Sequence, residues 1–212
     1  MQNDSISYHR QLGRIIEQVT QTGVRPRVLL HCCCAPCSSY VLDYLTSVFD
    51  VTCYYFNPNI FPEEEYQRRR DQFDKLFSST KYRNDVYFME GDYQPNVYYS
   101  TVKGFEQCKE GKDRCLRCYA LRLLMTAKTA EKMEYDYFTT TLTVSPHKNA
   151  DDINQVGLMI SQMTGINWLP SDFKKSNGFI KSIELSRNYG LYRQSYCGCV
   201  YSFSERMKIG DE

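Results

Sequence analysis

The chain has 212 residues and a mass of 24.9 kDa, with 26 basic residues (Lys and Arg) against 25 acidic residues (Asp and Glu). A formal net charge of +1 excludes a protein that binds nucleic acid through a generally basic surface, so such contacts must come from local patches. No apolar run of about 18 residues is present to span a membrane, and the first residues lack the apolar centre of a signal peptide. We therefore expect a cytoplasmic protein without a membrane partner, whose ten cysteines serve a metal or catalysis.

Strand and helix patterns alternate along most of the chain. Residues 1–25 are expected to form an amino-terminal helical extension. The strands expected after it are 28–30, 51–56, 85–89, 137–141 and 167–169, and the expected helices are 36–45, 62–77, 114–133 and 151–163. Such alternation predicts a parallel sheet with helices on both faces. Residues 26–205 are therefore expected to form a single open α/β domain, Rossmann-like and nucleotide alpha-hydrolase-like.

The cysteines include three groups that lie far apart in the sequence. The first group follows the first predicted strand, the second begins a long predicted helix, and the third is near the carboxyl end. They are Cys32-Cys33-Cys34 with Cys37, Cys115 with Cys118, and Cys197 with Cys199. Because ligands of open α/β sheets gather beyond the carboxyl ends of the strands, we expect the groups to converge on one site.

Two of these groups have the composition of a metal site. Cys115 and Cys118 are three residues apart on a predicted helix and therefore share one face. Adjacent Cys33 and Cys34 can face one centre only if the backbone leaves the strand there, which Pro36 favours. Four thiolates fit a [4Fe–4S] cluster, and tetrahedral zinc is the competing occupant.

The third group differs in kind. One glycine separates Cys197 from Cys199, so a disulfide between them would be strained and reducible, as catalytic disulfides are. The alternative is that both are further metal ligands. Cys37 begins a predicted helix, where the dipole lowers a thiol pKa; it is a reactive thiolate, an extra ligand or a small buried residue. The cysteines left out of the site are Cys32, Cys53 and Cys108.

Polar segments near the predicted strand ends are candidates for substrate contacts. Thr141, Ser145 and His147 follow a strand, with Lys148 next to them, and hydroxyls, an imidazole and an ammonium there can bind an anion and hand over a proton. Strand propensity and helix capping explain the hydroxyls equally well. Two basic stretches, 68–70 and 174–181, are candidate nucleic-acid patches, and a solvated helix face and a solvated loop are their respective alternatives.

Seven segments together resemble the QueH-type epoxyqueuosine reductases, over a stretch from about residue 27 to about residue 202. The segments are 29–38, 57–60, 90–93, 114–118, 138–149, 170–175 and 191–199. The resemblance implies reduction of epoxyqueuosine to queuosine at the wobble position of the tRNA anticodon. It also implies two partners, the tRNA anticodon arm and an electron donor.

The resemblance further implies roles for individual residues. Cys33, Cys34, Cys115 and Cys118 correspond to ligands of a [4Fe–4S] cluster, and Cys197 with Cys199 corresponds to a redox-active pair. An additional iron ion is implied near the cluster, with Cys37 as a plausible neighbour. Three basic residues lie in the resembling segments and are expected to hold tRNA phosphates. They are Lys174, Lys175 and Arg193.

Two other functions compete with this interpretation. One is a zinc-stabilised RNA-binding module in which all the thiols are structural, which metal analysis distinguishes from an iron–sulfur enzyme. The other is a cluster-dependent tRNA thiolase, which would need ATP. The sequence contains no glycine-rich phosphate loop for ATP and no G-x-G-x-x-G after the first strand for a dinucleotide.

Overall fold

A five-stranded parallel sheet forms the centre of the computed structural model, which describes residues 7–79 and 86–210. Its strands are β1 (Arg27–His31), β2 (Asp50–Tyr55), β3 (Tyr87–Glu90), β4 (Tyr137–Thr140) and β5 (Asn167–Trp168). The spatial order is β3-β2-β1-β4-β5. The chain adds β2 and β3 on one side of β1 and then crosses to add β4 and β5 on the other side. The predicted open α/β fold is confirmed, and its switch point lies where ligands bind in such sheets.

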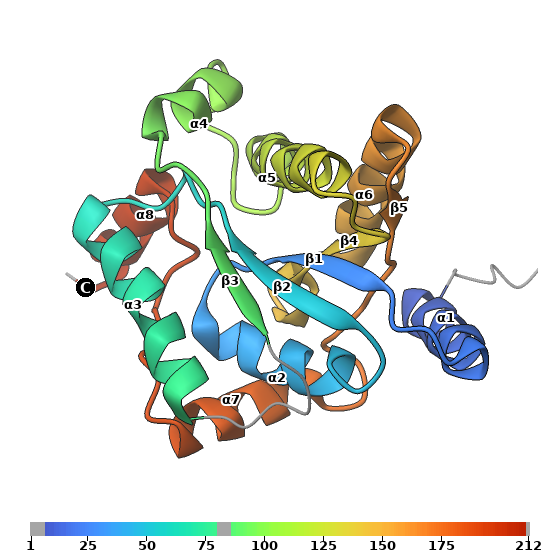
Figure 1. The fold of residues 1–212 in the computed structure, drawn as a ribbon. Coiled ribbons are helices and arrows are strands. Elements are labelled where there is room, and N and C mark those ends of the chain that lie inside the picture. Colours follow the sequence, from blue (N-terminus) through green and yellow to red (C-terminus); the bar gives the residue numbers. More distant parts are fainter. Residues whose placement is uncertain (1–6, 80–85, 211–212) are drawn as a thin grey trace, which may run out of the picture.

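Eight helices connect and cover the strands within the described residues (Figure 1). They are α1 (Tyr8–Thr22), α2 (Ala35–Leu45), α3 (Glu63–Ser79), α4 (Pro95–Val102), α5 (Asp113–Lys132), α6 (Ala150–Thr164), α7 (Gly178–Asn188) and α8 (Val200–Gly210). The sequence patterns predicted α1, α2, α3, α5 and α6, but they missed α4, α7 and α8. The alternative interpretation of the stretch 174–181, a solvated loop, is wrong for residues 178–181. These residues begin α7, which follows Asn177 with its φ of +63°. Asp85, the expected first residue of β3, lies outside the described residues.

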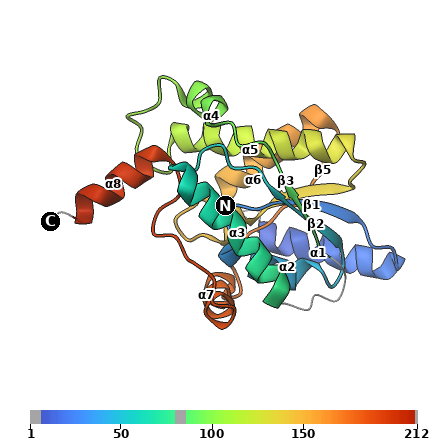
Figure 2. The same ribbon diagram turned by 60° about the vertical axis from the view of Figure 1, so that its left-hand side comes forward.

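The helices lie on both faces of the sheet. Figure 2 shows α1, α2, α3 and α7 on one side and α4, α5 and α6 on the other. Side chains alternate along β1, so Val28 and Leu30 pack into the core with α1 and α2, while Leu29 packs against α5. No helix in the described ranges is long and apolar enough to cross a bilayer.

Candidate functional site

The first group of thiols lies in the turn between β1 and α2, next to the switch point. Cys34 has extended backbone angles and precedes α2, and Pro36 occupies the first turn of that helix. The backbone N–H of Cys33 donates to Thr141 Oγ1 at 3.2 Å, which joins this turn to the segment after β4. The ligand atoms of Cys33, Cys34 and Cys37 all lie within 4.8 Å of one another. Three sulfurs so close together form a donor group suited to a soft metal.

Hydrogen bonds among these three sulfurs shift the pKa values of the thiols in different directions. Hydrogen bonding with the sulfurs of Cys34 and Cys37 holds the pKa of Cys33 well below its usual range. The same bonding raises the pKa of Cys34 to about 11 and that of Cys37 well above its usual range. Cys33 is therefore the most acidic thiol of this group. The helix dipole does not make Cys37 the acidic thiol, as its position at the start of α2 suggested.

The second and third groups lie close together. Cys118 of α5 packs against Cys199, which precedes α8, in a small buried cluster with Tyr98 of α4. The backbone N–H of Gly111 donates to Cys115 Sγ at 3.2 Å. Burial raises the pKa of Cys118 to about 12 and also raises that of Cys115. Cys197 and Cys199 contribute electrostatically to both shifts, so all four thiols share one electrostatic environment.

The pair Cys197 and Cys199 consists of free thiols, as do the other eight cysteines. Cys199 is buried and lies 3.4 Å from Ser202 Oγ. Cys197 is only partly buried and faces a cavity. Gly198 between them has φ +133°, and a Cβ there would lie 3.0 Å from the Arg69 guanidinium, so glycine is needed to hold the two thiols at this turn.

A cavity of about 590 Å³ connects the thiols with the predicted substrate residues. Its lining comes from the turn after β1, from α5, from the segment after β4, from α7 and from the segment before Cys199. The lining residues are Cys33, Cys37, Glu110, Arg122, Thr141, Leu142, Ser145, His147, Lys148, Phe179, Arg193, Gln194, Ser195, Tyr196 and Cys197. Four of the predicted substrate residues, Thr141, Ser145, His147 and Arg193, therefore share a cavity with Cys33, Cys37 and Cys197.

Lys174 and Lys175 lie outside this cavity. They line a neighbouring cavity of about 560 Å³, to which α1 contributes Tyr8 and His9. His147 and Lys148 line both cavities, so the two are adjacent. Lys174 Nζ also pairs with Asp172 Oδ1 at 2.6 Å, which leaves exposed Lys175 as the simpler candidate for a phosphate contact.

Three of the predicted substrate residues in the first cavity have side-chain partners within the protein. Thr141 Oγ1 lies 3.4 Å from Cys33 Sγ, so this hydroxyl positions the thiolate. Ser145 Oγ accepts the backbone N–H of His147 at 3.3 Å. Arg193 Nη1 donates to Ser186 Oγ at 3.0 Å.

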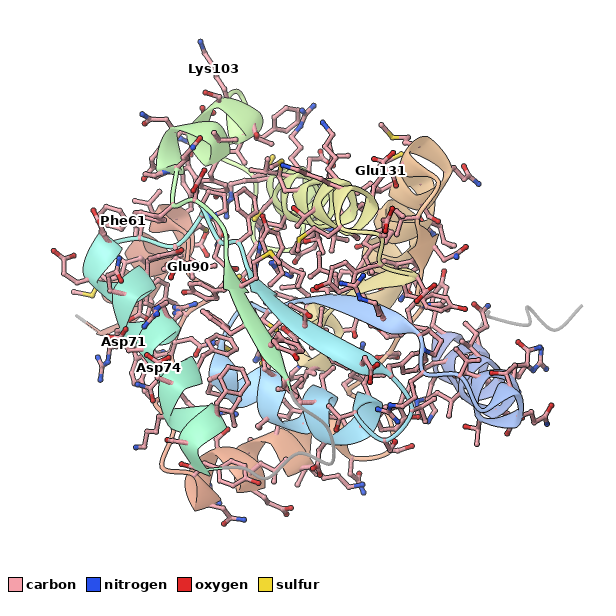
Figure 3. All side chains as sticks on the ribbon, in the orientation of Figure 1. Phe61, Asp71, Asp74, Glu90, Lys103 and Glu131 are labelled. Atoms are coloured by element: carbon pink, nitrogen blue, oxygen red, sulfur yellow. The ribbon has the colours of Figure 1, made fainter. Side chains whose placement is uncertain are left out.

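The arginine stretch 68–70 has a structural role. Arg69 is buried and pairs with Glu65 at 2.7 Å, and Arg68 stacks on the Tyr192 ring. Arg70 pairs with Asp71, Asp74 and Glu90, whose side chains are labelled in Figure 3. These contacts neutralise much of the stretch and attach the segment before Cys197 to α3.

Three further polar residues at the cavity were not selected from the sequence as site residues. Arg122 is buried in α5, and Lys148 has a raised pKa because negative charge on Cys197 and Cys33 outweighs the effect of burial. Gln194 Nε2 donates to Cys34 Sγ at 3.2 Å, while its buried Oε1 has no partner. One signal was available for Arg122, which follows Cys115 and Cys118 by seven and four residues on the same helix face.

Comparison with known proteins assigns this arrangement to a family. A family model described as "Epoxyqueuosine reductase QueH" matches residues 28–205. A protein of that name from Streptococcus pyogenes serotype M1 is 46% identical over 203 residues, which are 94% of this chain and 79% of the relative. Another from Staphylococcus epidermidis is 42% identical over 207 residues, covering 95% of this chain and 87% of the relative. A third, from Thermotoga maritima, is 38% identical over 184 residues, covering 84% and 91% respectively.

Proposed function

The chain belongs to the epoxyqueuosine reductase QueH family, and we propose that it reduces epoxyqueuosine to queuosine at the wobble position of tRNA. The observation that carries the proposal is the single cavity at which redox-capable thiols meet hydroxyl, imidazole and ammonium groups. Removal of the epoxide oxygen breaks two C–O bonds and forms an alkene. This conversion consumes two electrons and two protons and releases one water molecule.

Cys197 and Cys199 have the positions expected of a dithiol that supplies those electrons. Cys197 reaches the cavity, and Cys199 lies behind it beside Cys118. Oxidation of two thiols to one disulfide releases two electrons and two protons, which balances the epoxide reduction. The donor that restores the dithiol would then act between turnovers.

We propose that Cys33, Cys34, Cys115 and Cys118 hold a [4Fe–4S] cluster and that Cys37 contributes to an additional iron site. The donor set supports this assignment, because it is composed of thiols, and the cations of buried Arg122 and half-buried Lys148 can compensate negative charge at the site. When bound, the cluster supplies single-electron transfer and an electrophile for oxygen. Thr141 holds the Cys33 thiolate in place, and Gln194 donates to Cys34.

The cavities also support a role for the basic residues in tRNA binding. The cavity beside the thiols has room for a modified base, and His147 at its wall can deliver a proton. The neighbouring cavity carries Lys174 and Lys175 and would hold the adjoining nucleotides of the anticodon arm. Arg193 lines the first cavity and can approach the same strand from the other side.

The experiment that tests the function is nucleoside analysis of tRNA from cells that lack this protein. We expect epoxyqueuosine to accumulate, and expression of the wild-type chain to restore queuosine. Restoration by a Cys197→Ser variant at the wild-type level would contradict the role of the dithiol. Unchanged queuosine in the deletion strain would contradict the function itself, provided that the strain has no second epoxyqueuosine reductase.

Metal analysis of anaerobically purified protein separates the proposal from the zinc-stabilised RNA-binding module. Iron with acid-labile sulfide supports the redox enzyme, and zinc without sulfide supports the module. Dependence of turnover on ATP would instead favour a tRNA thiolase.

A further inference from the structure

Arg122 is a buried cation that contacts the ends of several structural elements around the thiols. It lies in the middle of α5 and is 2% exposed, yet its guanidinium reaches the cavity wall. Nη2 donates to Asn57 Oδ1 at 2.6 Å, and Nε donates to His31 Nε2 at 3.2 Å. Nη1 lies 3.9 Å from Cys118 Sγ. The guanidinium is therefore held in one position beside the second group of thiols.

The partners of Arg122 are themselves fixed. Asn57 Nδ2 donates to the backbone carbonyl of Cys32 at 2.9 Å, and His31 Nδ1 lies 2.8 Å from Thr140 Oγ1. Because His31 Nε2 accepts from Arg122, this nitrogen carries no proton and the imidazole is neutral. A neutral imidazole accepts from Arg122 at Nε2 and donates to Thr140 from Nδ1. The ends of β1 and β4 and the segment after β2 thus orient the guanidinium.

Among the described residues, no carboxylate forms an ion pair with Arg122, and its two best hydrogen-bond partners, Asn57 and His31, are neutral. A buried charge without a counterion is strongly destabilising, so the site favours an anion beside the guanidinium. Cys118 lies in contact with it and Cys33 on the same cavity wall. Both are proposed cluster ligands, and thiols lose their proton when they bind a metal.

We infer that Arg122 is a positioning residue whose permanent charge lies beside the proposed ligands Cys33 and Cys118, and that it raises the reduction potential of the metal centre they hold. This inference rests on the proposed cluster. A reduced cluster carries one more negative charge than the oxidised one, and a fixed cation nearby stabilises the reduced state more. The hydrogen bonds to Asn57 and His31 hold the planar guanidinium in place, which a flexible lysine side chain would do less well.

Redox titration of anaerobically purified variants tests the inference. Arg122→Gln removes the charge and keeps hydrogen-bonding capacity, and we expect its midpoint potential to fall by about 59 mV or more, a tenfold change in a one-electron equilibrium. Arg122→Lys keeps the charge and should recover most of the shift. Arg117→Gln is the matched control, because Arg117 lies on the same helix but is exposed and stacks on Phe105. The midpoint potential of this variant should remain at the wild-type value.

A second variant keeps Arg122 and changes its partner. Asn57→Asp places a carboxylate 2.6 Å from the guanidinium and neutralises it, so the potential should fall as in Arg122→Gln. This variant decides the inference if Arg122→Gln does not fold. Wild-type potentials in both Asn57→Asp and any folded Arg122→Gln protein would overturn it. Wild-type protein without iron and sulfide would instead contradict the proposed cluster on which the inference rests.

Discussion

Cys33 is the residue at which the chain leaves the sheet and the site begins. The sequence predicted that the backbone leaves the strand at Cys33 and Cys34, and β1 indeed ends at His31, before both cysteines. It offered Cys37 as a reactive thiolate, an extra ligand or a small buried residue, and could not choose among them. The ligand atoms of Cys33, Cys34 and Cys37 lie within 4.8 Å of one another because the first turn of α2 brings Cys37 back to the preceding residues. Which of these thiols has the lowest pKa depends on hydrogen bonds between the sulfurs, and the spacing of cysteines in the sequence does not predict them.

Replacement of Cys115 tests whether thiols from α5 are iron ligands. We expect Cys115→Ala to lose most of its iron and all turnover, because an iron without a protein thiolate is rarely retained. Cys53→Ala is the matched control, since Cys53 is equally buried but lies in the core along β2. Iron and sulfide are measured per protein chain. Full iron content and normal activity in Cys115→Ala would remove Cys115 from the ligand set.

The pair at the carboxyl end is tested separately. Cys197→Ser and Cys199→Ser should keep the cluster absorbance and lose multiple turnover, because the dithiol moves electrons and does not anchor iron. The measurement compares visible absorbance with product formed per enzyme over time. Loss of iron in either variant would show that these cysteines are ligands.

At the scale of the element, regular alternation of strand and helix was predictable, while connections with unusual caps were not. The buried runs in β1 and β2 and the long helix α5 have strong patterns, and the structure confirms them. The helix α7 was missed because it begins after Asn177 in a left-handed conformation, and its first residue is glycine. The eight-residue helix α4 is too short for a periodic pattern to identify.

Packing of α6 against the sheet gives a prediction for stability. Gly157 faces Trp168, and the Cβ of an alanine there would lie 2.3 Å from Trp168 Cε2. We expect Gly157→Ala to lower the free energy of unfolding by about 1–3 kcal/mol, as overpacking does. Gly13→Ala is the control, because no atom lies within 4 Å of that Cβ, and the helix propensity of alanine should stabilise α1 by up to about 1 kcal/mol. Denaturant unfolding measures both, and equal stability of Gly157→Ala and wild type would contradict the close packing.

At the scale of the whole molecule, the near-zero net charge shapes the expected contact with tRNA. The arginines at 68–70 looked like a basic patch in the sequence, but they form ion pairs on α3 and stack on an aromatic ring. The remaining candidates lie around two adjacent cavities at one end of the sheet. Sequence alone could not distinguish basic residues that are paired within the protein from those free to contact tRNA. The pairing of Arg70 with Glu90, for example, requires β3 to lie beside α3.

The lysines of the second cavity give a prediction for tRNA binding. The double variant Lys174→Ala/Lys175→Ala should bind tRNA more weakly, and the slope of log K against log salt should decrease by about 1 for each lost phosphate contact. Lys132→Ala is the control, because Lys132 is exposed and is the last residue of α5. Affinity is measured across a salt series. An unchanged constant and slope would remove this patch from the binding surface.

The most direct test of the account uses the purified protein, prepared without oxygen and supplied with a reductant. It is incubated with tRNA that carries epoxyqueuosine, and the nucleosides are then separated and identified by mass. We expect conversion to queuosine, with loss of one oxygen atom, by protein that contains iron and sulfide. Unchanged epoxyqueuosine after incubation with folded, iron-loaded and reduced protein would contradict the central claim.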